Sequence, residues 1–202
     1  MSGADLTARQ LELIRALAAL EPPPWFMGGY AEDALLAGAV TREHEDVDLI
    51  FPRAEEELRL AQLAELGFSD WETWGEAAPG LPFYLFGESG GLRLDLGIVD
   101  QDDGDNWMRV HRLAFTVGDE EAPAGYQLRL PDDMFDHPAV ELAGIALRPI
   151  SPLALYQIRA GVAQRNSFGP LSERQRVTMA ALRERFFGDV AEHDLLPPSE
   201  PL

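Results

Sequence analysis

The chain has 202 residues, 46% of them hydrophobic, and is therefore long enough to bury one substantial core. Its 35 acidic and 16 basic side chains give a formal net charge of −19, which disfavours nucleic-acid binding because a polyanion would be repelled. The lack of cysteine excludes disulfides, thiolate nucleophiles and cysteine-based zinc sites, and the lack of long apolar runs predicts a cytoplasmic protein without a signal peptide or a membrane span.

Helical and strand patterns alternate along the first half of the chain. Leucine and isoleucine at helical spacing predict an amphipathic helix over residues 6–20. The apolar run at 25–27 predicts a buried strand, and the pair Gly28 and Gly29 turns from it into a second helix over 30–36. A strand, a helix and three further strands are predicted next, over residues 46–51, 53–66, 68–71, 81–86 and 92–99.

The second half of the chain is predicted to contain short strands and then two helices. The strands are expected over residues 113–117, 126–130 and 145–150. Ser151 as cap and Pro152 at the first helical position predict a helix over 153–164, and a last helix is predicted over 172–187. The whole pattern predicts an α+β fold, a mixed sheet flanked by helices, divided into a main domain, a C-terminal helical segment and a mobile tail at residues 1–150, 151–190 and 191–202.

Two aspartates, Asp46 and Asp48, stand two residues apart in one predicted strand. Because side chains alternate along a strand, both carboxylates project from one face while Val47 points to the other. Carboxylates so close repel each other unless a cation neutralises them, and Mg²⁺ held by carboxylates and substrate phosphates is the usual arrangement at phosphoryl-transfer sites. The alternative is an exposed strand end with two solvated acids.

A third acid, Asp95, interrupts an otherwise apolar strand. Leu94 and Leu96 share one face of it, so Asp95 projects from the other face together with Arg93. If this strand lies beside the strand of Asp46, three carboxylates converge, and such a set can hold two Mg²⁺ ions about 4 Å apart for in-line displacement at phosphorus. Asp95 could also take the proton from an acceptor hydroxyl, and the sequence leaves the roles of ligand and general base open.

The glycine pair and the loop before the double aspartate are candidates for binding phosphate. Gly28 and Gly29 open a helix directly after a strand, where backbone N–H groups and the helix dipole can face a triphosphate. Arg42 is a candidate phosphate clamp, because its guanidinium fork matches phosphate oxygens. His44 is a candidate nucleotide contact. The alternatives are a plain glycine turn, a surface ion pair of Arg42 with a neighbouring glutamate, and a loop-capping role for His44.

An aspartate-rich stretch follows the strand of Asp95. The stretch is not a calcium-binding loop of the EF-hand type. With Gly104 at loop position six, Val99 falls at position one, where an acidic ligand is needed. We interpret the stretch as a solvated turn whose charge could help to attract a cationic acceptor. Its acids are Asp100, Asp102, Asp103 and Asp105.

Residues 25–36 (WFMGGYAEDALL) and 41–49 (TREHEDVDL) resemble the aminoglycoside 2''-nucleotidyltransferases, and the lincosamide nucleotidyltransferases look similar too. The resemblance implies the polymerase-β-like superfamily, so that the main domain is a nucleotidyltransferase domain built on a mixed sheet. It implies a structural role for Asp33. The residue roles that it implies are Mg²⁺ binding by Asp46, Asp48 and Asp95, and triphosphate contacts by Gly28, Gly29 and Arg42.

The resemblance implies Mg²⁺-dependent transfer of a nucleoside monophosphate, with ATP as the expected donor, to a hydroxyl of an aminoglycoside antibiotic. A cationic acceptor agrees with the net charge of −19, and no nucleic acid or membrane partner is expected. Where relatives have a lysine after the Tyr156 region, this chain has Arg159, which can also bind phosphate. The alternatives are a lincosamide acceptor, a toxin that modifies a protein or tRNA, and an inactive nucleotide-binding module.

Overall fold

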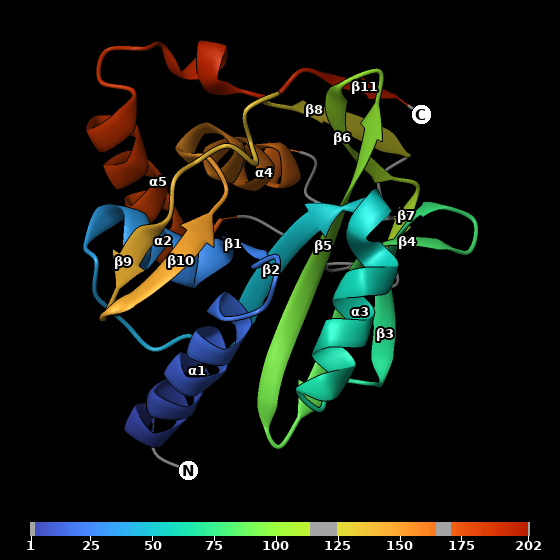
Figure 1. Ribbon diagram of the computed structural model, residues 1–202. Coiled ribbons are helices and arrows are strands. Elements are labelled where there is room, and N and C mark those ends of the chain that lie inside the picture. The colour runs from blue at the N-terminus through green and yellow to red at the C-terminus, as the bar shows by residue number, and fades with distance from the viewer. Residues whose placement is uncertain (1–2, 114–124, 165–170, 202) are drawn as a thin grey trace.

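The protein is described by a computed structural model that covers residues 3–113, 125–164 and 171–201. Figure 1 shows an extended, twisted sheet with helices packed around it, which confirms the predicted α+β class. Within the described residues, no helix combines the length and hydrophobicity needed to span a membrane.

Three central strands carry the part of the fold that positions the site: β1 (Trp25–Met27), β2 (Val47–Pro52) and β5 (Leu92–Asp102). Strand β2 runs parallel to β5 and antiparallel to β1, and β1 in turn runs parallel to β10 (Ile145–Pro149). The sheet is therefore mixed, as expected. Its main path has the order β11-β8-β6-β5-β2-β1-β10-β9, with β3 and β4 joined to it through β5.

The helices bury apolar stripes against this sheet. Helix α1 (Gly3–Ala18) inserts Leu13, Ile14 and Leu17, which fits the helical spacing of its apolar residues. Helix α2 (Gly28–Leu36) follows β1 without a loop and begins two residues earlier than predicted. The other helical elements are η1 (Arg53–Glu55), α3 (Glu56–Glu65), α4 (Pro152–Gln164), α5 (Glu173–Phe186) and η2 (Glu192–Leu195).

The remaining strands differ from the predictions in several places, and β6 and β9 were not predicted at all. The prediction of a strand at 68–71 is wrong. The N–H of Phe68 donates to the carbonyl of Leu63, and the buried Phe68 side chain closes the end of helix α3. The next strand starts only at Trp71. A strand that was not predicted, β6, pairs with the end of β5. The bounds are β3 (Trp71–Ala78), β4 (Leu81–Ser89), β6 (Asp105–Val110), β7 (Arg112–Leu113), β8 (Tyr126–Leu130) and β9 (Val140–Leu142).

The C-terminal residues also have regular structure that the sequence did not predict. Strand β11 (Ser199–Pro201) pairs antiparallel with β8, and Leu195 in η2 is buried. Most of the strand predicted at 113–117 lies outside the described residues. The division of the chain at residues 150 and 190 stays a prediction.

Candidate active site

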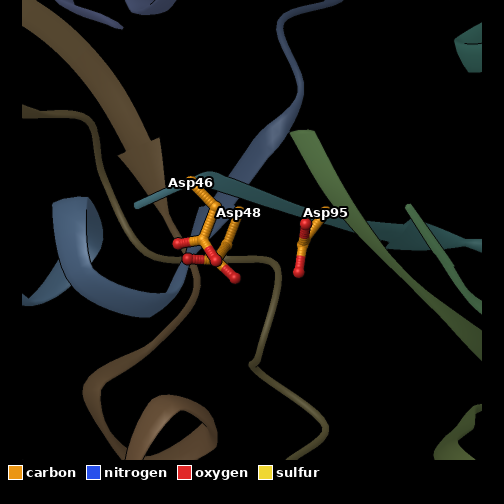
Figure 2. A group of neighbouring side chains, drawn as sticks. All are labelled: Asp46, Asp48 and Asp95. Atoms are coloured by element: carbon orange, nitrogen blue, oxygen red, sulfur yellow. The ribbon is translucent and has the colours of Figure 1, made fainter. Parts of the chain in front are cut away.

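Three carboxylates converge where β2 and β5 lie side by side. The parallel register pairs Asp48 with Asp95, and Asp46 lies one residue before β2. One oxygen from each of the three carboxylates lies within 4.8 Å of the others. Figure 2 shows the side chains of Asp46 and Asp48 close together and that of Asp95 to one side of them. The structure thus brings together the three acids that the sequence singled out.

The electrostatics of this cluster favour a bound cation. Burial, followed by the charges of Asp46 and Asp95, raises the pKa of Asp48 well above its usual range. Burial and the charge of Asp95 also raise the pKa of Asp46, against the opposing effect of Arg93. A divalent cation would relieve this repulsion, and an all-carboxylate donor set is chemically suited to Mg²⁺.

Asp95 is held from two sides by its own sheet. Arg93 donates from Nε to Oδ1 at 2.7 Å and from Nη2 to Oδ2 at 2.9 Å, while the Tyr84 hydroxyl donates to Oδ2 at 2.9 Å. The Asp95 side chain is only 3% exposed, whereas that of Asp46 is 29% exposed. Asp46 therefore lies at the open side of the cluster and Asp95 at its closed side.

The glycine pair lies directly against the cluster. Gly28 has a φ of +63°, and a Cβ built on it would lie 1.9 Å from Oδ2 of Asp48. A Cβ on Gly29 would lie 2.2 Å from Nδ1 of His44. These glycines bring the start of helix α2, where backbone N–H groups lack helical acceptors, close to the carboxylates. The pair is more than a plain turn, since both missing side chains face residues of the site.

His44 and Asp33 shape the loop that carries Arg42. The buried His44 ring contacts Asp33 through Nε2 at 2.8 Å and Arg42 through Nδ1 at 2.9 Å. Asp33 also accepts from the backbone N–H of Thr41 at 2.9 Å and from its hydroxyl. Burial would raise the pKa of Asp33, but the hydrogen bonds from His44 and Thr41 outweigh it and lower that pKa. This pattern supports the structural role expected for Asp33 and shows both His44 nitrogens engaged within the protein; its contact with nucleotide stays a prediction.

A buried glutamate that sequence reasoning missed connects two arginines. Glu32 forms ion pairs with Nη2 of Arg42 at 3.4 Å and with Arg159 of helix α4. Arg42 is therefore not paired with a neighbouring glutamate of its own loop. Glu32 places both guanidinium groups beside helix α2. Its helical position carries no sequence signal of this role, because Arg159 is distant in the chain.

A cavity of about 260 Å³ opens beside the cluster, between the sheet and helix α4. Asp48, Gly28 and Arg159 line it together with Gln175. The remaining walls are mostly apolar and include Ile50, Phe83, Val99, Met108, Leu155 and Ile158. The cavity therefore combines a charged end at the carboxylates with an apolar interior.

Comparison with known proteins shows what this part of the chain is similar to. The family model for aminoglycoside-2''-adenylyltransferase matches residues 10–80, which hold the glycine pair, Arg42 and the double aspartate. One similar solved structure is the crystal structure of ANT(2'')-Ia in complex with adenylyl-2''-tobramycin. The two sequences are 26% identical, the match covers 88% of this chain and 99% of that chain, and the TM-score is 0.55. The chain is therefore similar to the aminoglycoside 2''-nucleotidyltransferases.

A second solved structure shows the same likeness in fold. The solution structure of the antibiotic-resistance factor ANT(2'')-Ia has the same fold, at 23% identity over 91% of this chain and 84% of that chain and a TM-score of 0.57. No curated protein matches. The predicted enzyme class, a nucleotidyltransferase, is confirmed.

The structure shows how the aspartate-rich stretch after β5 is built. The aspartate-rich stretch after Asp95 does contain an exposed turn, which joins β5 and β6 in a hairpin, and arginines pair with most of its acids. Asp100 pairs with Arg53 and Arg109, and Arg109 also pairs with Asp102. Asp105 pairs with Arg129 at 2.6 Å. Asp100 lies about 17 Å along the strand from Asp95, and the attraction of a cationic acceptor by these acids stays a prediction.

Proposed function

We propose that this chain transfers a nucleoside monophosphate, with ATP as donor, to a hydroxyl of an aminoglycoside in a Mg²⁺-dependent reaction. The observation that carries the proposal is the convergence of Asp46, Asp48 and Asp95 beside the start of helix α2. ANT(2'')-Ia, a protein of similar sequence and fold, has been crystallised with an adenylylated aminoglycoside, which supports both the reaction and the acceptor.

The residues of the cluster fit a magnesium site. The donors are carboxylate oxygens, the repulsion among them raises the pKa of Asp46 and Asp48, and Gly28 leaves the carboxylate of Asp48 uncovered. When bound, Mg²⁺ would neutralise charge that develops on the transferring phosphoryl group. Asp46 and Asp48 would hold the ion, together with an oxygen of Asp95.

The triphosphate would bind between helix α2 and two arginines. The backbone N–H groups at Gly28 and Gly29 offer donors at the positive end of the helix. Arg42 and Arg159 are held on the same side by Glu32 and would pair with phosphate oxygens as planar forks. The apolar cavity next to Asp48 would take the nucleoside, whose flat base fits apolar walls.

The acceptor would approach from the exposed side of the cluster, at Asp46. Asp95 would either accept the proton of the attacking hydroxyl or complete the metal site, and its hydrogen bonds from Arg93 and Tyr84 fix the direction of its free lone pairs. The net charge of −19 would draw in a polycation over a distance of about 10 Å at moderate salt.

A matrix of nucleoside triphosphates against antibiotics, with Mg²⁺ present and pyrophosphate release as the readout, tests the proposal. We expect release with ATP and an aminoglycoside of the kanamycin or gentamicin type, and a mass increase of one nucleotidyl group on the antibiotic. The matched control is Asp48→Asn, which should release none. Release with a lincosamide or a protein alone would show that the acceptor assignment is wrong.

A further inference from the structure

We infer that Glu32 is a positioning residue for the nucleotide. Its buried carboxylate holds Arg42 of the loop and Arg159 of helix α4 as one preformed pair of cations, so that binding of the triphosphate depends on a residue that need not touch it. The inference rests on the function proposed above and deepens it, because the affinity for the phosphates then belongs to an ion-pair network that joins helix α4 to helix α2.

Glu32 lies four residues after Gly28, about one turn into helix α2. Helical side chains tilt toward the N-terminus of their helix, so this carboxylate lies alongside the turn that begins at Gly28. The Glu32 side chain is only 4% exposed. A carboxylate so far from water is stable only beside cations, and two arginines supply them.

Arg42 and Arg159 come from segments far apart in the chain, and the carboxylate of Glu32 is what they share. Oε2 pairs with Nη2 of Arg42 at 3.4 Å and Oε1 pairs with Nη2 of Arg159, so each oxygen holds one guanidinium. Two guanidinium groups without this anion would repel each other, and their long side chains would become ordered only when the triphosphate binds. One carboxylate between two arginines also leaves a net positive charge, which favours a further anion.

Both guanidinium groups border the start of helix α2. Nη2 of Arg42 lies 2.8 Å from the Cβ that would be built on Gly29, and Arg159 lines the cavity beside the carboxylate cluster. Nη1 of Arg42 also donates to Nδ1 of His44 at 2.9 Å, since a guanidinium can only donate. The contacts with Glu32 and His44 use two of the five N–H groups of Arg42, so its fork can still donate to phosphate oxygens.

Calorimetric titration with Mg²⁺ and α,β-methylene-ATP, whose bridging carbon blocks nucleotidyl transfer, tests the inference without turnover. Glu32→Gln should weaken binding of this analogue at least about tenfold, because a neutral amide cannot fix two guanidinium groups. Adenosine, which has no phosphate, should bind to the variant and the wild type alike. Glu55→Gln is the matched control, since it also removes the carboxylate partner of a buried arginine, Arg59, but lies beyond the far end of β2. It should bind the analogue as the wild type does.

NMR spectra of the guanidinium groups show whether the pair is already formed in the nucleotide-free protein. The Nη signals stay separate when a guanidinium is held and average when it rotates freely. Both arginines, assigned through Arg42→Lys and Arg159→Lys, should be held in the wild type, and Arg159 should rotate in Glu32→Gln. Arg59 should stay held in both proteins, which shows that the fold is intact.

Freely rotating guanidinium groups of Arg42 and Arg159 in the wild type would overturn the inference even if Glu32→Gln failed to fold. Unchanged or tighter binding of the analogue by Glu32→Gln would overturn it as well, while leaving the proposed function intact. An equal loss for adenosine would also overturn it, because Glu32 would then support the fold in general. If the wild type itself did not bind the analogue, the proposed function would be wrong.

Discussion

Asp48 is half-buried and has two negatively charged neighbours, Asp46 and Asp95, so its replacement tests both the metal site and the repulsion. We expect Asp48→Asn to lower pyrophosphate release by at least about a thousandfold, because a metal ligand is lost. Its pKa is raised in the folded protein, so the ionised form destabilises the fold as the pH rises above the unfolded value. Without metal at pH 7, the variant should therefore melt at a higher temperature than the wild type. The exposed Asp70→Asn should change neither quantity.

Arg42 is the residue on which the triphosphate assignment depends most. Arg42→Ala should weaken nucleoside-triphosphate binding by roughly 1.5–3 kcal/mol, as expected for the loss of a charge-assisted hydrogen bond. Calorimetric titration measures this directly, with Arg112→Ala as the control on an exposed arginine. An unchanged affinity would leave Arg42 as a partner of Glu32 and His44 only.

The network around Asp33 makes stability depend on pH in a predictable direction. The pKa of Asp33 is lowered in the folded protein, so its contribution to stability is present above the unfolded pKa of about 3.9 and is lost as the pH falls through the folded value. Asp33→Asn should therefore cost about 1–3 kcal/mol of unfolding free energy at pH 7. Denaturant titrations should show this difference shrinking as the pH falls below the unfolded pKa; a constant difference would contradict the assignment.

At the scale of elements, the turn from β1 into α2 leaves no room for a side chain. Gly28→Ala would combine a positive φ with a Cβ only 1.9 Å from Asp48, whereas Gly80→Ala has a similar φ of +75° but open space around it. Both should lose roughly 1–2 kcal/mol through backbone strain, and Gly28→Ala should lose more and also lose nucleotide binding. Thermal melts and titration with ATP separate the two effects. Equal behaviour of both variants would argue against close packing at Gly28.

Which elements could be predicted depended on whether the signal was local. Strand alternation was enough to put Asp46, Asp48 and Asp95 on the correct faces. The turn between β5 and β6 was predicted but the hairpin was missed, although a local signal was present: Asp103 and Gly104 both have positive φ and form the Asp-Gly turn typical of two-residue hairpins. The contact of Glu32 with Arg159 had no such signal, because it forms only when α4 packs near α2.

For the whole molecule, the net charge should govern acceptor binding. With the hairpin acids neutralised by arginines, the attraction comes from the summed field and from the cluster itself. Aminoglycoside affinity should therefore fall clearly between about 50 and 500 mM salt, as the screening length shortens. Titration of kanamycin at both salt concentrations checks this, with a neutral sugar as the control ligand. Salt-independent binding would mean that acceptor recognition is mainly uncharged.

Because Asp48 and Asp95 are paired across two parallel strands, activity should depend on which face of β5 the Asp95 side chain occupies. Successive side chains of β5 point to opposite faces, so losing a single residue just before Asp95 would turn its carboxylate into the apolar packing now filled by Leu94 and Leu96. Losing two residues there would restore the alternation. Deletion of one residue in this short segment should therefore give an inactive protein, and deletion of two residues an active one. No single substitution can produce this alternation.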